Sequence, residues 1–486
     1  MSNTLSSLEP KSLWAYFEAI CNIPHPSKKE KAIIEYVKGI GEGAGLETIA
    51  DHVGNIVIRK PATRGMENRK TIVLQGHLDM VPQKNNDTVH DFDKDPIVPY
   101  IDGDWVKARG TTLGADNGIG VAAALAVLTD DKLEHGPIEG LFTVDEETGM
   151  TGAFELRPGL LKGDILINLD SEDEGELYIG CAGGMDTNAF ISYKEEAVPA
   201  EHLAFKVEVK GLKGGHSGLD IKLGRGNAIK ILNRLLWQAE REIGLRLSSV
   251  DGGSLRNAIP REASAIIAIP EKNREQFEAL AKSMQSTLVN QLGSVDPGVS
   301  LSVSPAAMPA SVMDSQSCKN TLNAVYACPN GPVRFIAEMP DVVETSTNLA
   351  ILKSGDGLVE IATLQRSSVD SAKQDLCNMI RTVFEMAGAR VEQSGEYPGW
   401  KPNVDSPILK TMKEVYLNLY GKTPEQKVIH AGLECGILGA AYPNMDMISF
   451  GPTIRNPHSP DEMVNIKTVK LFYEYLTETL KNAPVK

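Results

Sequence analysis

Residues 71–82 read TIVLQGHLDMVP, and this stretch indicates both a fold and a chemistry. Its first half is a short apolar and β-branched run, as expected of a buried strand. His77 and Asp79 follow at once, two residues apart. In extended backbone such residues point to one side, so Asp79 can reach the His77 imidazole. This arrangement is typical of a metal-ligating histidine whose tautomer is fixed by a second acid.

The segments on either side of this stretch alternate between strand and helix patterns. We expect helices at residues 12–42, 118–128, 408–420 and 465–482, and strands at residues 55–59, 71–74, 138–144, 164–169 and 447–450. Short apolar runs that alternate with helical patterns predict an α/β domain, a mixed sheet covered by helices.

The middle of the chain follows a different pattern. A glycine-rich stretch lies at residues 180–184, clearer polar/apolar alternation starts at Leu203, and a Pro/Gly cluster ends the segment at residues 397–402. We therefore expect a catalytic domain of residues 1–183 and 399–486, with an inserted α+β lid domain of residues 184–398. A strand and a helix pattern follow both Asn257 and Asn348, so an internal duplication of the insert and a chance likeness are both open.

Composition and charge exclude several classes of protein. The 486 residues are 42% hydrophobic and 23% charged, which is ordinary globular composition. The formal net charge of −15 opposes binding to nucleic acid and to anionic lipid. The apolar run at residues 117–129 is too short to cross a membrane, and Glu9 and Lys11 interrupt any secretory signal. Six scattered cysteines fit reduced thiols, so we expect a cytoplasmic protein without nucleic-acid or membrane partners.

Four further motifs place acids or histidines beyond predicted strands or beside helices. They are GADNG at residues 114–118, DEETG at 145–149, LDS at 169–171 and NPHSPDE at 456–462. Each has an ordinary structural explanation when taken alone; Asp116, for example, could be a helix cap. Together, two histidines and several carboxylates suit two divalent ions of the zinc type with one bridging carboxylate. Two such ions activate a shared water and polarise a carbonyl, as in aminopeptidases.

The order of these motifs, with an inserted domain before the last, resembles the M20 family of dinuclear zinc peptidases. The stretch VPQKNNDTVHDFDKDPIVPYIDGDWVKARGTTLGADNGIG, residues 81–120, is the most distinctive part. It resembles the cytosolic dipeptidases of that family that act on Xaa-His dipeptides such as carnosine. The likeness runs from Leu13 to the C-terminus.

The resemblance implies two Zn²⁺ ions per chain, for which Co²⁺ or Mn²⁺ can substitute. His77, Asp116 and Asp170 would hold one ion. Asp116, Glu147 and His458 would hold the other, so that Asp116 is the bridge. The family pattern also implies a cis peptide bond after Asp116.

Three further residues receive catalytic roles from the resemblance. Asp79 would orient His77, and Glu146 would be the general base. His216, in KGGHSG at residues 213–218, would stabilise the oxyanion of the tetrahedral intermediate.

The substrate-binding residues are harder to place. The family's D-x-R arginine is absent at residues 268–271, where the sequence reads AIPE. Arg366 is the candidate for the substrate carboxylate, because a guanidinium binds carboxylates in bidentate fashion. Asn257 and Asn348 complete the expected substrate-binding set. His430 could line the pocket, whereas the remaining histidines, including His25 and His135, are expected in surface or turn roles.

The resemblance thus implies hydrolysis of unblocked dipeptides, Xaa-His dipeptides among them, by a water between two zinc ions with Glu146 as base. An N-acyl-amino-acid deacylase of the same family is the alternative. A non-catalytic zinc-binding protein is a third possibility, which the intact set of ligands disfavours. A homodimer is expected from the family.

Overall fold

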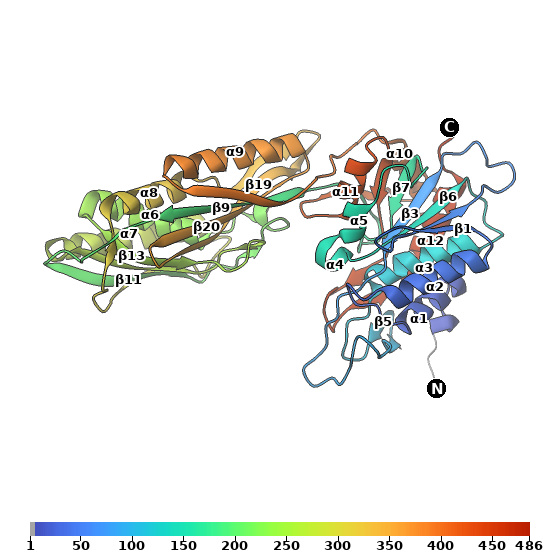
Figure 1. Ribbon diagram of the computed structural model, residues 1–486, viewed down its shortest axis with the longest axis horizontal. Coiled ribbons are helices and arrows are strands. Elements are labelled where there is room, and N and C mark those ends of the chain that lie inside the picture. The colour runs from blue at the N-terminus through green and yellow to red at the C-terminus, as the bar shows by residue number, and fades with distance from the viewer. Residues whose placement is uncertain (1–4) are drawn as a thin grey trace. The chain divides into compact units, whose positions relative to one another are not determined.

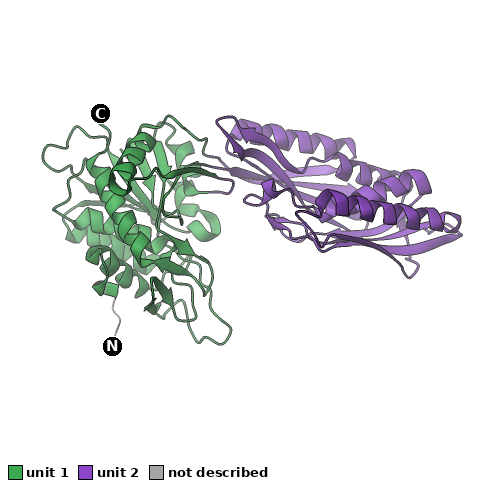
Figure 2. Cartoon of the chain, turned by 180° about the vertical axis from the view of Figure 1, so that it is seen from behind, with its two compact units in different colours: residues 1–180, 400–428, 433–486 green, residues 181–399, 429–432 purple. Residues whose placement is uncertain are grey.

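The structure, a computed structural model, describes residues 5–486 (Figure 1). The chain forms two compact units (Figure 2). Unit 1 is Met1–Gly180, Trp400–Val428 and Leu433–Lys486, and unit 2 is Cys181–Gly399 and Ile429–Gly432. Residues 1–4 of the expected catalytic domain lie outside the described residues. The short return of Ile429–Gly432 to unit 2 is a feature that the expected division of the chain does not contain.

The centre of unit 1 is an eight-stranded sheet. In spatial order its strands are β1 (Glu47–Ala50), β2 (Ile56–Lys60), β6 (Ile138–Thr143), β3 (Ile72–His77), β7 (Ile165–Asn168), β23 (Asp446–Ser449), β8 (Glu176–Cys181) and β22 (Glu425–Ile429). Strands β6, β3, β7 and β23 run parallel, and antiparallel strands flank them. Every residue of β3 and β6 is buried, which is typical of parallel strands covered on both faces. The expected α/β class with a mixed sheet is confirmed.

The helices of unit 1 cover this sheet. They are α1 (Lys11–Cys21), α2 (Lys31–Gly43), α3 (Ala115–Thr129), α4 (Glu146–Gly149), α5 (Thr151–Glu155), α10 (Pro407–Tyr420), α11 (Glu434–Ala441) and α12 (Ile466–Lys481), with a 3₁₀ turn at Leu5–Ser7. Helix α3 is buried along nearly its whole length, between β3 and α1. The single helix expected at residues 12–42 is wrong, because Pro24 and Pro26 lie in the segment that separates α1 from α2.

A second, four-stranded sheet in unit 1 joins strands near the end of the chain to strands in its first quarter. Its order is β24 (Ile454–Arg455), β25 (Met463–Asn465), β5 (Trp105–Ala108) and β4 (Pro99–Asp102). Strands β24 and β25 pair with each other, and β25 pairs with β5. The loop between β24 and β25 carries His458, so this small sheet fixes both ends of that loop.

Unit 2 is built on a nine-stranded antiparallel sheet. Its strands are β16 (Ser300–Pro305), β11 (His202–Lys210), β15 (Ala263–Pro270), β13 (Arg246–Gly252), β19 (Met339–Gly355), β20 (Leu358–Ser367), β9 (Gly183–Ser192) and β21 (Arg390–Tyr397), with β18 (Gly331–Ile336) beside β19. One apolar core joins this sheet to α6 (Ala228–Ile243), α7 (Arg274–Leu292), α8 (Ser315–Ala327) and α9 (Asp370–Met386). The short elements are β10 (Glu195–Glu196), β12 (Gly215–His216), β14 (Ala258–Ile259), β17 (Val312–Met313) and 3₁₀ turns at Ile221–Leu223 and Glu271–Asn273.

The two halves of the unit 2 sheet have the same strand order. Spatially, β16-β11-β15-β13 in one half corresponds to β21-β9-β20-β19 in the other, and β13 pairs with β19 where the halves meet. Along the chain, the first half lies between β9 and α8 and is therefore nested inside the second. The strand and helix after Asn257, β15 and α7, occupy the same places as β20 and α9. Asn348, however, lies within β19, whereas Asn257 lies between β13 and β15.

None of the helices in residues 5–486 combines the length and apolarity needed to cross a bilayer. All six cysteines lie in this described part of the chain, and they are buried and form no disulfide.

The close packing of α3 gives a test of the fold. A methyl group at Gly120 would lie 2.6 Å from the Leu169 backbone oxygen, which cannot move aside without disturbing β7. We expect Gly120→Ala to lower the free energy of unfolding by about 1–3 kcal/mol. In the matched control Gly39→Ala, on α2, the new methyl group meets nothing within 4 Å, so we expect a gain of about 0.5–1 kcal/mol. Urea denaturation of both variants measures this, and equal stability of the two would contradict the packing.

Candidate metal centre

The predicted metal ligands of unit 1 gather at the carboxyl ends of the parallel strands. His77 is the last residue of β3, Glu147 follows β6, and Asp170 follows β7. Asp116 lies in the first turn of α3, and His458 lies in the loop between β24 and β25. The edge formed by the carboxyl ends of parallel strands is where α/β proteins place their ligand sites.

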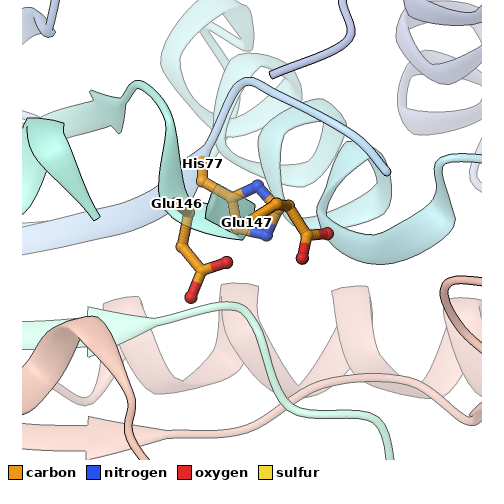
Figure 3. A group of neighbouring side chains, drawn as sticks. All are labelled: His77, Glu146 and Glu147. Atoms are coloured by element: carbon orange, nitrogen blue, oxygen red, sulfur yellow. The ribbon is translucent and has the colours of Figure 1, made fainter. Parts of the chain in front are cut away.

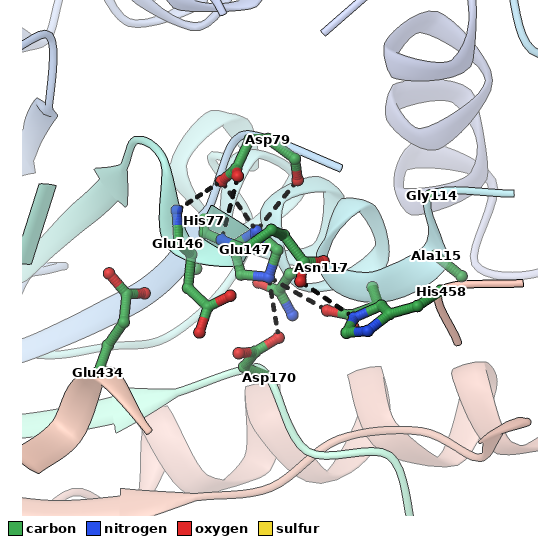
Figure 4. Close-up of polar contacts among 12 residues, drawn as sticks. His77, Asp79, Gly114, Ala115, Asn117, Glu146, Glu147, Asp170, Glu434 and His458 are labelled. Atoms are coloured by element: carbon green, nitrogen blue, oxygen red, sulfur yellow. Dashed lines mark hydrogen bonds and ion pairs between the residues drawn. The ribbon is translucent and has the colours of Figure 1, made fainter. Parts of the chain in front are cut away.

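The Asp116 carboxylate lies between the two histidines. Its Oδ1 is 3.1 Å from Nε2 of His77, and its Oδ2 is 3.1 Å from Nε2 of His458. Asp170 Oδ1 lies 3.4 Å from Nε2 of His77, and Glu147 Oε2 lies 3.0 Å from Nε2 of His458 (Figure 4). The peptide bond between Asp116 and Asn117 is cis, as the family pattern implies.

These side chains form two groups that could each hold a metal ion. His77, Asp116 and Asp170 make one group, and Asp116, Glu147 and His458 make the other. Asp116 belongs to both. Glu147 Oε1 is buried and accepts no hydrogen bond, and Asp170 Oδ1 has only the ion-pair contact with His77, so each group offers an oxygen to a metal ion. A mixed set of imidazole nitrogens and carboxylate oxygens suits zinc and similar ions.

Glu146 gives a third possible grouping, with His77 and Glu147 (Figure 3). Proximity alone therefore does not distinguish the two adjacent glutamates. Their contacts differ, however, because only Glu147 forms an ion pair with a histidine, His458, among the residues that the structure describes.

The electrostatics of the cluster favour added positive charge. Burial, with Asp116 nearby, raises the pKa of Asp170 to about 8. Burial likewise raises the pKa of Glu146 well above its usual value. Hydrogen bonds to Asp116 and Glu147 raise the pKa of His458 to about 11. The cluster thus holds more carboxylates than its two imidazoles can balance, and divalent cations would supply the missing charge.

Asp79 contacts both His77 and the backbone of the turn that carries Glu146 and Glu147. Nδ1 of His77 lies 3.0 Å from the Asp79 backbone oxygen and 3.4 Å from its Oδ1, so both the backbone and the side chain fix the tautomer. The carboxylate also accepts hydrogen bonds from the Ser27 hydroxyl at 2.7 Å and from the backbone N–H groups of Glu146 and Glu147 at 2.9 and 3.2 Å. Burial works against ionisation, but the bond with His77 outweighs it and lowers the pKa of Asp79 to about 2.

The turn that carries Glu146 and Glu147 begins at Asp145. This residue has a left-handed backbone, with φ of 54°, a conformation that aspartate adopts more readily than most residues other than glycine. Its carboxylate accepts hydrogen bonds from the hydroxyls of Thr148 and Thr151, and its N–H donates to Glu30 at 3.0 Å. These contacts hold the turn in place, which lets two consecutive side chains serve one site.

Glu462 is a residue that the sequence interpretation missed. Its buried carboxylate accepts hydrogen bonds from four consecutive backbone N–H groups, those of Leu113, Gly114, Ala115 and Asp116, at 2.7, 2.9, 2.8 and 3.2 Å. It therefore links the His458 loop to the backbone of the Asp116 loop. Glu462 is part of the quoted motif NPHSPDE, but a sequence pattern does not identify a partner so far away along the chain.

Glu434 is a second buried acid that was missed. It is the first residue of α11 and is 1% exposed. Its Oε2 accepts hydrogen bonds from the side chains of Gln75, at 2.6 Å, and Thr143, at 2.9 Å. Burial raises the pKa of Glu434 to about 7.

His216 lies in unit 2 with a defined tautomer. Its Nδ1 accepts hydrogen bonds from the backbone N–H groups of Gly218 and Leu219 at 3.2 and 3.1 Å. Burial, with the Arg366 guanidinium nearby, lowers the pKa of His216. A neutral ring that accepts at Nδ1 carries its proton on Nε2, so His216 presents a hydrogen-bond donor there.

Other predicted residues of unit 2 adjoin His216. Asn348 donates to the backbone oxygens of Arg256 and Ala258, on either side of Asn257, and the Asn257 oxygen accepts from Ser217 N–H at 2.8 Å. The side chain of Asn257 is exposed.

Arg366 is buried in unit 2. One of its nitrogens donates to the Tyr397 hydroxyl at 2.8 Å, while its Nε has no hydrogen-bond partner. Its charge lowers the pKa of both His216 and His430, after the effect of burial, so the three side chains share one environment. The Ser346 hydroxyl contacts Nε2 of His430 at 2.7 Å.

Two histidines expected in surface or turn roles are buried. His135 is 0% exposed and contacts the Gly136 backbone oxygen. His25 is 3% exposed, beside the segment that supports Asp79, and lies in a turn between two prolines. Burial lowers the pKa of both rings, which therefore pack as neutral groups.

Histidines and carboxylates at the carboxyl ends of the parallel strands of a mixed sheet are the arrangement expected of a metal-dependent hydrolase of the α/β class. The chain belongs to peptidase family M20/M25/M40, whose family model matches residues 73–482. The family resemblance given by the motifs is confirmed.

Similar proteins cover the whole chain. The cytosol non-specific dipeptidase of Escherichia coli (strain K12) is 51% identical over 482 residues, which is 99% of each chain. The solved structure of aminoacylhistidine dipeptidase from Vibrio alginolyticus has 49% identity and a TM-score of 0.97, and the match covers 100% of this chain and 99% of that one. Aminopeptidase PepT from Bacillus cereus ATCC 10987, with 17% identity and a TM-score of 0.58 over 98% of this chain and 99% of that chain, shares the fold alone.

The Glu462 contacts predict a measurable loss in a near-isosteric variant. In Glu462→Gln an amide NH₂ replaces one acceptor oxygen and faces backbone donors. We expect the free energy of unfolding to fall by about 1–3 kcal/mol, because buried N–H groups lose their acceptor. Bound metal should also be lost more readily on dialysis, because Asp116 is no longer held in place.

The neighbouring variant Asp461→Asn is the matched control, because Asp461 is exposed. We expect its stability to stay within about 0.5 kcal/mol of the wild type. Denaturation curves and metal analysis after dialysis measure both effects. A Glu462→Gln protein as stable and as zinc-retentive as Asp461→Asn would contradict the role of Glu462.

Proposed function

We propose that this chain is a cytoplasmic metallodipeptidase that hydrolyses unblocked dipeptides, including Xaa-His dipeptides such as carnosine. The observation that carries the reaction type is the Asp116 carboxylate, which directs one oxygen to each of two histidines within two groups of potential metal ligands. The substrate class rests on the names of the two relatives near 50% identity. A homodimer stays a prediction.

Two zinc ions are the cofactors that this donor set fits best. His77, Asp116 and Asp170 would hold one, and Asp116, Glu147 and His458 would hold the other. When bound, such ions supply Lewis acidity and an activated water. The chain's own part is to orient these ligands, which the contacts of Asp79 and Glu462 serve.

Glu146 is the proposed general base. It takes a proton from the attacking water and returns it to the amine that leaves. A base for this task needs a pKa near the working pH, and burial moves the pKa of Glu146 in that direction. Asp79 holds the Glu146 N–H at 2.9 Å and thereby fixes the backbone from which the base projects.

The proposed roles in unit 2 are charge stabilisation and substrate binding. His216 donates its Nε2–H to the oxyanion of the tetrahedral intermediate, a role that its accepting Nδ1 supports. Arg366, with a buried Nε that lacks a partner, binds the substrate carboxylate. Asn348 holds the backbone on both sides of Asn257, whose exposed side chain completes the substrate-binding set.

A panel of substrates tests the proposed function. We expect zinc-loaded protein to hydrolyse carnosine and Ala-His, to leave N-acetyl-Ala-His intact, and to lose activity with a chelator. An N-acyl-amino-acid deacylase would instead cleave N-acetyl amino acids and ignore free dipeptides. Full metal content with no hydrolysis of either class would indicate a non-catalytic protein.

The adjacent glutamates give a sharper test of the mechanism. Glu146→Gln keeps the size of the side chain and removes the base, so we expect two zinc ions retained and kcat lowered by at least about 10²-fold. Glu147→Gln removes a metal ligand, so we expect one zinc ion lost and partial rescue by added zinc.

Each variant is the control for the other, because the change and its position are nearly the same. Metal analysis and kcat with and without added zinc separate the two roles. The assignment fails if Glu146→Gln loses metal and responds to zinc while Glu147→Gln keeps both ions and stays inactive.

A further inference from the structure

Glu434 carries a buried negative charge that the proposed mechanism does not use. Its Oε2 is held by the side chains of Gln75 and Thr143, neither of which is a cation. Its Oε1 is buried and has no hydrogen-bond partner. A buried carboxylate oxygen without a partner is costly, so such an atom usually marks a place where a ligand binds.

A chain of hydrogen bonds fixes the direction of this carboxylate. Gln75 Oε1 accepts from Asn168 at 2.6 Å, and Asn168 Oδ1 accepts from the Ser449 hydroxyl at 2.5 Å. These residues lie on β3, β7 and β23, the central strands of the sheet. Because rigid strands hold Gln75, the Glu434 carboxylate is oriented before any ligand arrives.

Glu434 lies beside the metal cluster. Its Oε2 accepts from Gln75, two residues before His77 on β3, and from Thr143, which pairs with His77 across β3 and β6. Figure 4 shows Glu434 on the side of the cluster where Glu146 lies. A cationic group close to the cluster would therefore satisfy Oε1.

The other carboxylates of this region have partners. Asp79 accepts from Ser27 and from two backbone N–H groups, and Glu462 accepts from four. Asp116, Asp170 and Glu147 are the proposed metal ligands. Glu434 differs from Asp79 and Glu462 in having a buried oxygen without a partner, and it is not a proposed metal ligand.

We infer that Glu434 binds the free ammonium group of the dipeptide and so selects unblocked substrates. This inference rests on the proposed function. An ammonium group donates to Oε1 and pairs with the charge, whereas an acylated or missing amine leaves Oε1 unpaired. Glu434 would therefore separate a dipeptidase from a deacylase built on the same metal ligands.

Ala-His and propionyl-His test this, since they differ only in the amino group. We expect kcat/KM of the zinc-loaded wild type to be higher for Ala-His by roughly 10–150-fold, the range for a hydrogen bond to a charged group. In Glu434→Gln the amide oxygen can still accept from Gln75 and Thr143. The variant should retain its zinc and lose most of this preference, chiefly through slower hydrolysis of Ala-His.

Glu172→Gln is the matched control, because Glu172 is another acid beside the cluster, where burial and the charges of Asp116 and Asp170 raise its pKa to about 8. We expect Glu172→Gln to leave the ratio of kcat/KM for Ala-His to kcat/KM for propionyl-His unchanged. Glu434→Asp keeps the charge, so it should retain more of the preference than Glu434→Gln.

The outcomes separate this inference from the proposed function. If the wild type cleaves neither compound, the proposed function fails. If it cleaves both equally well, or if Glu434→Gln slows both equally, the proposed function stands and the ammonium site is overturned. If Glu172→Gln changes the kcat/KM ratio of the two substrates as much as Glu434→Gln does, the ammonium site is also overturned. The preference would then follow from the total negative charge of the region and not from Glu434. The ratio of kcat/KM for Ala-His to that for propionyl-His is measured on the wild type, so this part of the test does not depend on any variant that could fail to fold.

Discussion

One buried carboxylate holds the backbone from which Asp116 projects. Glu462 accepts hydrogen bonds from four successive amides, so the start of α3 cannot shift without leaving several buried N–H groups unpaired. Asp116 in turn faces both histidines at 3.1 Å. The spacing of the two potential metal groups therefore depends on an acid that is not itself a proposed ligand. The β24–β25 loop supplies both Glu462 and His458, which ties one ligand directly to this support.

The buried acids of unit 1 fall into groups according to the partners of their carboxylate oxygens. Asp79 and Glu462 are balanced by backbone amides and hydroxyls, and these two position other groups. Asp116, Asp170 and Glu147 have oxygens directed at imidazoles or left open, as expected of ligands awaiting a cation. Glu434 accepts hydrogen bonds at one carboxylate oxygen, Oε2, and has no hydrogen-bond partner at the other. The partners of a carboxylate thus indicate its role better than its burial does, since all of these side chains are largely removed from water.

The sequence predicted those parts of the site that follow strands in short motifs. His77 and Asp170 could be found this way, because the carboxyl ends of parallel strands meet at one edge. Glu434 and the partners of Glu462 could not, because their contacts join residues more than half the chain apart. The break between α1 and α2 was visible in Pro24 and Pro26, but the helical pattern on both sides obscured it. The nesting of the two halves of unit 2 has no local sequence signal, because it is defined by pairing between strands that are far apart in the sequence.

The pairing of the strands also sets an order of assembly during synthesis. In unit 1, β7 pairs with β23, and in unit 2, Ser192 of β9 pairs with Leu358 of β20. Neither sheet can be completed until its later strand has left the ribosome. The nested half of unit 2 is contiguous and can form first. The metal groups are completed last, because His458 and Glu462 lie near the end of the chain. A nascent or truncated chain that lacks His458 cannot assemble both groups of potential metal ligands, so it would make the fold's central strands before it could bind a pair of ions.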